Sequence, residues 1–467
     1  MIRRLKWCWL VLALAVPLAA ASPGGAAIEP PWCGTPMPDA AEALPSTGPG
    51  NFPHIPYYAI GCTLDRIAAQ SGGRMKIEVI GRSALGRDMY LVTINELKTG
   101  DQRRDFARWR VIDALSRSRP ELGKRLVERF GDNVKIPLFI QGGIHGNEYE
   151  GVDAVMRTIE RLATTPYGTD PEVDRILDRS VVLFNVIQNP DGRIAGLRQN
   201  GNGFDLNRDF LTQAQPETKA SVGIMQKWQP PDMLDLHGYL TPVMLIEATT
   251  KPHNPGIEYD LWLKWNQTRI DANEAALNAG GYGVQRPIND WCADAGEAYP
   301  YAGGVCPTND ATTSDDGLAP GPAAAEGWDD WGPFYTPMYS QLVGMNGSTV
   351  EMCQLTSCGG RLGARIQQEI TTWSTLLFNV EERHDVLMDE LEIYRRNAAD
   401  APRPACCPPP FDVRNNWMHD YHKAFVIPLG EGQRSDPEAN RLVEWLLLNG
   451  AEVEELKRDT RFEGQTF

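Results

Sequence analysis

Continuous apolar runs in this chain alternate with segments in which apolar residues recur every three or four positions. The runs at 136–141 and 181–187 have the length of buried strands. Between them, residues 150–163 show the spacing of a helix that buries one face. Buried strands that alternate with helices predict an α/β fold with parallel strand pairs. The same patterns predict further strands at 75–80, 89–94, 233–236 and 348–352, and helices at 63–69 and 370–396.

Residues with metal-binding and acid–base chemistry follow several of these predicted strands. His145 and Glu148 are three residues apart in IQGGIHGNEYEG, directly after the strand at 136–141. A histidine and a glutamate at this spacing are a weak signal alone. Three downstream segments strengthen it: NGFDLNRDF at 202–210, MLDLHGY at 233–239 and GSTVEM at 347–352. Sites lie beyond strand ends in α/β folds, so these segments are expected to form one site.

The residue types in these segments are those of a catalytic zinc site. Such a site has three protein ligands and keeps one position for water. His145, Glu148 and His237 fit this requirement. Asp205 is suited to orient a ligand histidine through its other ring nitrogen. Glu351 is suited to take a proton from the water and pass it to a leaving amine.

Two arginines add permanent positive charge to the predicted site. We expect Arg198 and Arg208 to serve a developing oxyanion and a substrate carboxylate. An arginine fork matches a carboxylate in two hydrogen bonds, which suits recognition of a free chain end.

With these residues in place, the chain resembles the zinc metallocarboxypeptidases of the carboxypeptidase A-like family over roughly residues 51–395. It is similar in particular to larger bacterial secreted members. The resemblance implies a mixed, largely parallel central sheet flanked by helices, and one zinc ion as the cofactor. It assigns His145, Glu148 and His237 as the zinc ligands. Arg198 matches the position of the family's oxyanion-stabilising arginine.

The resemblance also implies how the substrate is held. Asn207 and Arg208 match the residues that bind the C-terminal carboxylate of the substrate. The family places a mobile tyrosine over the substrate, and here Tyr335 and Tyr339 compete for that role; we favour Tyr335. A long insert that includes 291–331 separates His237 from Glu351, so the sequence does not predict the preferred terminal side chain.

The first 21 residues are typical of a secretory signal peptide. Arg3, Arg4 and Lys6 precede an apolar stretch at 7–18, and residues 19–21 offer a cleavage site. A membrane anchor is the alternative, but a span needs about 20 apolar residues. We therefore expect a secreted or periplasmic protein with no stable membrane anchor after cleavage.

Net charge bears on the binding partners of the protein, and cysteine content bears on the redox compartment in which it folds. The formal net charge is 45 − 61 = −16, which argues against nucleic acid and anionic membranes as partners. Removal of Cys8 with the signal leaves eight of the nine cysteines, and an even number in an exported chain suggests disulfides. Neighbours along the chain suggest the pairs Cys33–Cys62, Cys292–Cys306 and Cys353–Cys358.

Changes in composition predict the division of the chain. We expect a signal peptide at 1–21, an irregular segment at 22–50, the catalytic domain at 51–396, a Pro-rich linker at 397–424 and the start of a C-terminal accessory domain at 425–467. The last part is expected to be a small βαβ-like unit, with strands at 425–428 and 453–456 around a helix at 437–448. No closing element follows, which suggests truncation.

These observations predict an exported zinc-dependent carboxypeptidase that acts on the C-termini of peptides or proteins. An amidase on the same scaffold, acting on cell-wall stem peptides or N-acyl amino acids, is the alternative. A binding module that keeps the metal without activity is a third hypothesis, and Glu351 argues against it.

Overall fold

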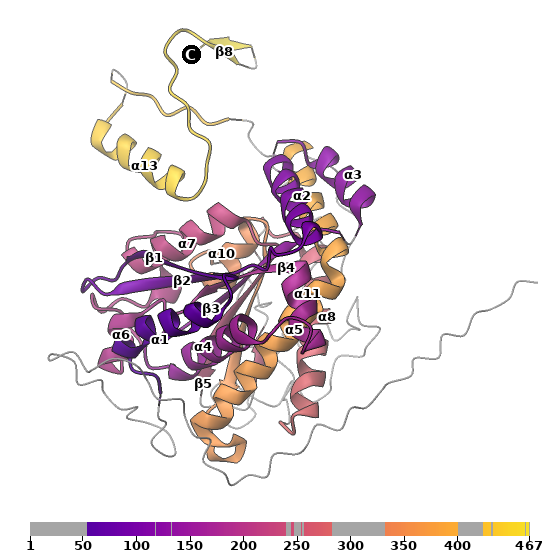
Figure 1. Cartoon of the computed structure of the whole chain (residues 1–467). Helices are drawn as coiled ribbons and strands as arrows, with labels where there is room; N and C mark the ends of the chain where they lie inside the picture. Colours follow the sequence, from indigo (N-terminus) through magenta and orange to yellow (C-terminus); the bar gives the residue numbers. More distant parts are fainter. Residues whose placement is uncertain are drawn as a thin grey trace, which may run out of the picture.

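Seven strands form one sheet in the part of the chain that the structure, a computed structural model, describes (Figure 1). The predicted signal peptide, the irregular segment at 22–50 and the insert at 291–331 lie outside this part, as does nearly all of the predicted linker. The described residues are 54–116, 118–131, 133–239, 244–246, 254, 256–282, 332–399, 424–430, 433–462 and 464–466.

The strands lie in the order β1-β2-β4-β3-β5-β7-β6 across the sheet. The four central strands β4, β3, β5 and β7 run parallel, and antiparallel pairs lie at both edges. This order confirms the predicted α/β fold with a mixed, largely parallel sheet. The bounds are β1 Met75–Arg82, β2 Asp88–Ile94, β3 Ile136–Gly142, β4 Ser180–Asn185, β5 Asp232–Tyr239, β6 Met244–Ile246 and β7 Asn346–Cys353.

The central strands β3 and β4 are largely apolar because both faces of the sheet are covered. In β4, Val182 and Phe184 pack into the larger core, whereas Val181 and Leu183 pack into a smaller core on the opposite face. Every residue of β3 and β4 is buried. Parallel strands enclosed on both faces carry continuous apolar runs, which is the pattern that made them recognisable in the sequence.

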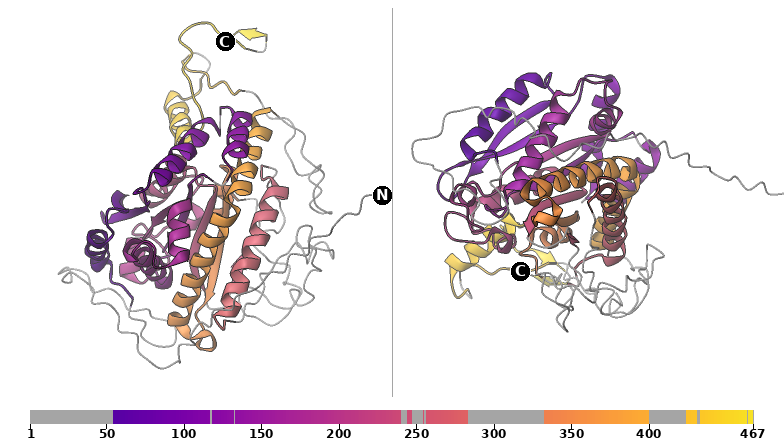
Figure 2. Two further views of the ribbon diagram at one scale, coloured as in Figure 1. Left: turned by 45° about the vertical axis from the view of Figure 1, so that its right-hand side comes forward. Right: turned by 90° about the horizontal axis from the view of Figure 1, so that it is seen from below.

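Helices form the two outer layers (Figure 2). The face with the larger core is covered by α4 (Tyr149–Thr164), α8 (Tyr259–Ala279) and α11 (Gly360–Ala399), and the other face by α7 (Pro216–Trp228) and α10 (Thr336–Leu342). The helix predicted at 150–163 is confirmed. Those predicted at 63–69 and 370–396 are parts of the longer α1 (Tyr57–Gln70) and α11. The described residues of the main body also form the α-helices α2 (Gly100–Ser116), α3 (Pro120–Phe130), α5 (Pro171–Arg179) and α6 (Pro190–Ala195).

The structure also bears on the predicted disulfides and on the question of a membrane span. A disulfide joins Cys353, at the end of β7, to Cys358, which confirms one predicted pair. Cys62 is disulfide-bonded as well; the other cysteines of the predicted pairs lie outside the described residues. Among the described helices, none has both the length and the apolar content to cross a bilayer.

The C-terminal part contains the predicted helix but not the predicted strands. Helix α13 (Asp436–Leu448) is present, whereas 425–428 and 453–456 belong to no strand. Instead, β8 (Arg461–Phe462) and β9 (Gln465–Thr466) form a short hairpin (Figure 1). The βαβ-like interpretation is therefore wrong. Phe425 is 81% exposed.

Candidate active site

The candidate site lies at the carboxyl ends of β3, β5 and β7. Gly142, the last residue of β3, is opposite Leu236 in β5. His237 follows and is opposite Glu351 in β7. Strand register therefore brings together residues that the long insert separates in the sequence. Ligand sites of parallel sheets occur at this edge.

A tight turn after β3 carries His145 and Glu148 to the same place. Gly143 has a φ of +68°, a conformation that a residue with a Cβ atom seldom adopts. A Cβ atom on Gly146 would lie 2.0 Å from the backbone carbon of Gly192 in α6. Only glycine allows this approach, so the turn is fixed against α6 and delivers Glu148 to the start of α4.

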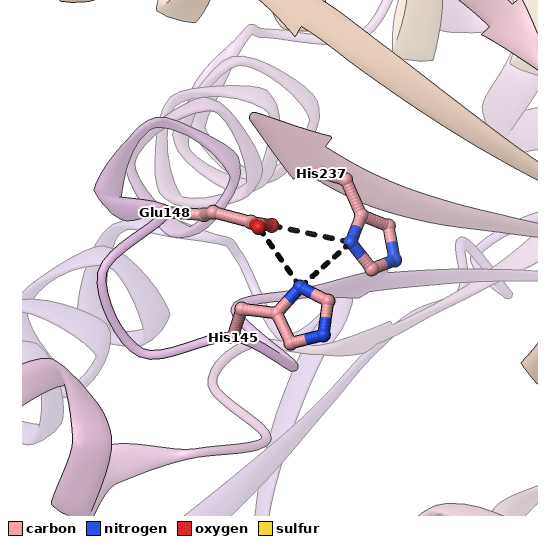
Figure 3. A group of neighbouring side chains, drawn as sticks. All are labelled: His145, Glu148 and His237. Carbon is pink, nitrogen blue, oxygen red and sulfur yellow. Dashed lines mark hydrogen bonds and ion pairs between the residues drawn. The ribbon is translucent and has the colours of Figure 1, made fainter. Parts of the chain in front are cut away.

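The side chains of His145, Glu148 and His237 converge on one point and are here called the metal centre (Figure 3). Nδ1 of His145 lies 2.8 Å from Oε1 of Glu148 and 3.1 Å from Nδ1 of His237. Nδ1 of His237 lies 3.2 Å from Oε2 of Glu148. All three residues are buried. Two imidazoles and one carboxylate facing a common point are a donor set that suits catalytic zinc.

Each histidine of the metal centre has its own carboxylate partner. Nε2 of His145 lies 3.2 Å from Asp205, and Nε2 of His237 lies 2.9 Å from Asp235. A carboxylate at Nε2 holds the proton there, which leaves the lone pair of Nδ1 directed at the common point. Asp205, which the sequence predicts to orient a ligand histidine, lies beside His145. Asp235 was missed, although it is two residues before His237, a spacing that puts both side chains on one face of a strand.

A row of buried polar side chains extends from Asp235 across the sheet. Nε2 of Gln141, opposite Asp235 in the register, lies 3.3 Å from the Asp235 carboxylate. Oε1 of Gln141 accepts hydrogen bonds from Asn185, opposite it in β4, and from Ser221 in α7. The row orients Asp235 and therefore the imidazole of His237. Gln141, Asn185 and Asp235 are polar residues within or at the end of apolar strands. This interruption of the apolar pattern was the sign of the row in the sequence.

Charge stabilises this cluster in a buried environment. Burial favours protonation of Glu148, but His145 and His237 outweigh it and hold the pKa of Glu148 well below its usual range. Burial alone would lower the pKa of His237, but Asp235 and Glu148 raise that pKa well above its ordinary value. The centre is therefore electrostatically suited to a cation, which would replace the proton on His237.

Glu351 faces the metal centre from β7 and is 4% exposed. Its Oε1 lies 3.9 Å from Nδ1 of His237. Among the described residues, its Oε2 has no hydrogen-bond partner. Burial raises the pKa of Glu351 to about 8, with His237 acting against the rise and Glu148 adding to it. A buried carboxyl with a free oxygen beside the metal centre is placed to exchange a proton with a reacting group.

Arg198 lies at the outer edge of the metal centre. Its Nη1 is 3.1 Å from Nδ1 of His145 and 3.7 Å from Oε1 of Glu148. Its Nε donates to Oδ2 of Asp205 at 3.0 Å. The side chain is 36% exposed, so one end is anchored to Asp205 while the guanidinium stays accessible. A permanent cation therefore lies beside the predicted ligands.

Three residues predicted to bind the substrate, here called the carboxylate-recognition group, lie next to Asp205: Asn207 and Arg208 in the short 3-10 helix Leu206–Arg208, and Tyr335 directly before α10. Oδ1 of Asn207 accepts from the backbone N–H and the hydroxyl of Thr336, at 2.9 and 3.0 Å. This leaves its amide N–H groups as the donors. The guanidinium of Arg208 lies 4.6 Å from the ring centre of Tyr335 and 4.0 Å from Oδ2 of Asp205.

Tyr339 lies apart from this group. It is 3% exposed and packs against Phe210, with ring centres 5.9 Å apart. Of the two tyrosines that the sequence left open, Tyr335 contacts Arg208 and Tyr339 belongs to a core. The role of Tyr335 over the substrate remains a prediction.

The sequence profile of the zinc carboxypeptidase family matches residues 61–305, just over half of the chain, and the chain belongs to this family. It is an enzyme of the zinc carboxypeptidase class, with one zinc ion as its cofactor and the metal centre as the site for it. Glu351 lies beyond the matched residues.

Individual relatives are similar over limited regions. Human carboxypeptidase D is 34% identical over 21% of this chain and 8% of its own length. Carboxypeptidase 2 of Trichophyton rubrum is 29% identical over 22% of this chain and 19% of its own length. The matches thus span less than a fifth of the length of these relatives.

Solved structures of metallo-carboxypeptidases are similar over a larger part of the chain. The enzyme from Burkholderia cenocepacia has 16% identity and a TM-score of 0.46, covering 71% of both chains. The enzyme from Pseudomonas aeruginosa has 19% identity and a TM-score of 0.43, covering 70% of both chains.

Proposed function

We propose that this enzyme hydrolyses the C-terminal peptide bond of peptides or proteins. One observation carries the proposal: the carboxylate of Asp205 connects the metal centre to both arginines. It lies 3.2 Å from His145, 3.0 Å from Arg198 and 4.0 Å from Arg208. Asp205 thus lies next to a predicted metal ligand, to the arginine proposed to stabilise the oxyanion and to the arginine proposed to bind the substrate carboxylate. This arrangement suits a substrate whose scissile bond is next to a free chain end.

The proposed division of labour follows from the positions of the side chains. His145, Glu148 and His237 hold the zinc ion, which supplies Lewis acidity that polarises a carbonyl and acidifies a water ligand. Glu351, whose Oε2 is free, accepts a proton from the attacking water, because the charge of a bound zinc ion lowers the raised pKa of this carboxyl. The same oxygen then delivers the proton to the nitrogen of the departing amino acid. One carboxyl group therefore acts first as base and then as acid.

The arginines stabilise the two negative charges of the reacting substrate. Arg198 has its guanidinium beside the metal centre, where charge develops on the carbonyl oxygen. Arg208 and the amide of Asn207 donate to the free carboxylate of the terminal residue. An internal peptide bond offers no carboxylate at that position. The carboxylate-recognition group therefore limits the enzyme to chain ends.

A pair of matched peptides tests this proposal. Each N-blocked peptide is presented with a free and with an amidated C-terminus, with and without a zinc chelator. We expect cleavage of the free-ended member alone, and its loss on chelation. Equal cleavage of both members would contradict exopeptidase action and remove Arg208 from its assigned role. Failure to cleave either peptide while zinc is bound would favour an amidase that acts on cell-wall or N-acyl substrates.

We further propose that the protein is exported, to the periplasm or the medium. The basic and apolar pattern of residues 1–21 supports this, and so does the disulfide between Cys353 and Cys358. Mass spectrometry of the protein from cell fractions is the test. A chain beginning after residue 21 and found outside the cytoplasm is expected, and an uncleaved cytoplasmic chain would contradict export.

A further inference from the structure

The end of α13 is attached to the main body at two places: the turn at 211–213, and the side chain of Gln226 in α7, which donates to the carbonyl oxygen of Leu448. Nε1 of Trp445 donates to the carbonyl oxygen of Leu211 at 2.8 Å, and Nδ2 of Asn449 donates to the same oxygen at 3.2 Å. In return, Nε2 of Gln213 donates to the carbonyl of Leu448 at 3.2 Å and to Oδ1 of Asn449 at 3.0 Å. The carbonyl of Leu448 is one that a helix end leaves without an internal partner.

Most of the hydrogen bonds between the end of α13 and the main body are made by residues 211–213, and Gln226 makes one more. Trp445 and Asn449 are only half-buried, and Ala439 is the only buried residue of α13. Beside this contact lies a groove of about 400 Å³ between Gly450 and the helices α7 and α10. The attachment is thus polar and local. Side chains in it are replaceable without opening the core of the main body.

The turn at 211–213 belongs to the loop that follows Arg208. Buried Asp209 organises this loop: its Oδ1 accepts from the N–H of Ala214 at 2.9 Å, and its Oδ2 accepts from the N–H of Gln215 at 2.8 Å. Gln213 has a φ of +48°, which is strained for a residue with a side chain. The hydrogen bonds from Gln213 to α13 help to keep it in this conformation.

The same loop is also joined to the segment that carries Tyr335. The N–H of Phe210 donates to the carbonyl of Phe334 at 3.3 Å, and the rings of Phe334 and Tyr335 are 4.5 Å apart. Arg208 and Tyr335 therefore flank a loop that α13 contacts from outside. No residue of α13 contributes to the metal centre by these contacts.

We propose that the end of α13 is a positioning element for the carboxylate-recognition group. Through Trp445 and Asn449 it holds the turn at 211–213, and this turn fixes the placement of Arg208 and Tyr335. The inference rests on the proposed function, because it assigns a position to the group that recognises the free chain end. It gives the C-terminal part of the chain a role in substrate affinity and leaves the chemical step to the metal centre.

Substitution of the two contact residues in the full chain tests the proposal. In the variant Trp445→Ala/Asn449→Ala, we expect the KM for a free-ended peptide to rise about fivefold, the effect of losing one or two hydrogen bonds. We expect kcat to change less than about twofold, because the metal centre is not involved. Trp445→Phe, which keeps the ring and removes the N–H donor, is expected to have an intermediate KM.

Two further measurements separate positioning from a general loss of structure. The matched control is Leu447→Ala. Leu447 is on the same helix and is 51% exposed, so its replacement is expected to leave KM unchanged. Hydrogen exchange, measured without substrate, reports on the turn itself: the amides of Ala214 and Gln215 are expected to exchange faster in the double variant. Bound zinc is expected to be the same in all variants.

The outcomes distinguish this inference from the proposed function. An unchanged KM in the double variant would overturn the positioning role, whether or not the amides exchange faster. A fall in kcat together with loss of zinc would overturn it as well, because the metal centre would then depend on α13. Equal cleavage of free and amidated peptides by the parent enzyme would refute carboxylate recognition itself. Faster exchange in the double variant would even then support the contact between α13 and the turn.

Discussion

The metal centre and the carboxylate-recognition group differ in how the fold places them. His145 and His237 are 2% and 0% exposed, and β3 and β5 deliver them through strand register and a glycine turn. The side chain of Arg208 is 44% exposed and extends from a single-turn 3-10 helix, Leu206–Arg208, held by a few hydrogen bonds. The buried centre cannot move without disturbing the sheet, whereas the carboxylate-recognition group depends on its local contacts. Changes in the first should therefore affect catalysis and metal binding, and changes in the second should affect affinity.

The largest effect is expected for Glu351→Gln. The amide keeps the shape of the side chain but cannot accept the proton of the attacking water, so kcat should fall about 10³-fold. Zinc content, measured by metal analysis, should stay at the parent value because Glu351 is not one of the predicted ligands. A variant that keeps zinc and full turnover would refute the proposed role of this residue.

Arg208→Ala is expected to act on affinity. Loss of a charged hydrogen bond to the substrate carboxylate should raise the KM for free-ended peptides about 10- to 100-fold, with a much smaller change in kcat. The control is Arg441→Ala, a change at a highly exposed arginine on α13. A fall in kcat at unchanged KM would show that Arg208 serves the chemical step. The metal centre and the carboxylate-recognition group would then not differ in the way proposed here.

The carboxylate partners of the two histidines give a smaller and more selective effect. Asp235 is fully buried within β5, whereas the side chain of Asp205 is 21% exposed on a loop. Asp235→Asn should weaken zinc binding about 10- to 100-fold, because an amide N–H at Nε2 would reverse the tautomer of His237. Asp205→Asn should weaken zinc binding less. Competition with a chelator measures both affinities, and the reverse order would contradict the comparison.

A modest pH effect is expected in protein stripped of zinc. Burial raises the pKa of Glu351 to about 8 from 4.5. Burial lowers the pKa of His237, but Asp235 and Glu148 outweigh it and raise that pKa well above 6.5. The folded state then holds more protons than the unfolded state, so stability is greatest near pH 4.5 and falls as pH rises towards 8.

Thermal unfolding of the metal-free protein at several pH values measures this fall. Glu351→Gln should flatten it, because one of the two shifted groups is removed. Addition of zinc at pH 7 should release at least one proton, that of His237, into a weakly buffered solution. A melting temperature that is constant or rises over this pH range would contradict the assigned charges.

The sequence predicted the buried centre better than its surroundings. His145 and Glu148 follow a long apolar run, whereas His237 and Glu351 lie near the ends of two shorter predicted strands, and parallel strands bring such positions to one edge. Asp235 was missed because a carboxylate within a strand resembles any polar interruption until its partner is known. The roles of Asn207, Arg208, Arg198 and Tyr335 remain predictions, although the structure places them beside Asp205.

One helix that the sequence did not predict and one strand that it predicted wrongly both depend on tertiary contacts. Helix α2 has few buried residues, and Trp109 and Ile112 are its main apolar contacts, so no clear apolar face is visible. Residues 425–428 have the composition of a strand, but a strand forms only where a neighbour supplies hydrogen bonds. These residues belong to no strand, and Phe425 is 81% exposed. The local apolar pattern identified strands and helices that are buried in the core. It failed for elements whose formation depends on contacts with distant parts of the chain.

Zinc titration of the metal-free enzyme tests the central claim most directly, with cleavage of a free-ended peptide and its amidated twin followed together. We predict that cleavage of the free-ended peptide rises with added zinc and saturates at one ion per chain, while the amidated twin stays almost uncleaved. Saturation at one ion with equal cleavage of both peptides would contradict recognition of the chain end. Cleavage before any zinc is added would contradict the metal centre as the site of the chemistry.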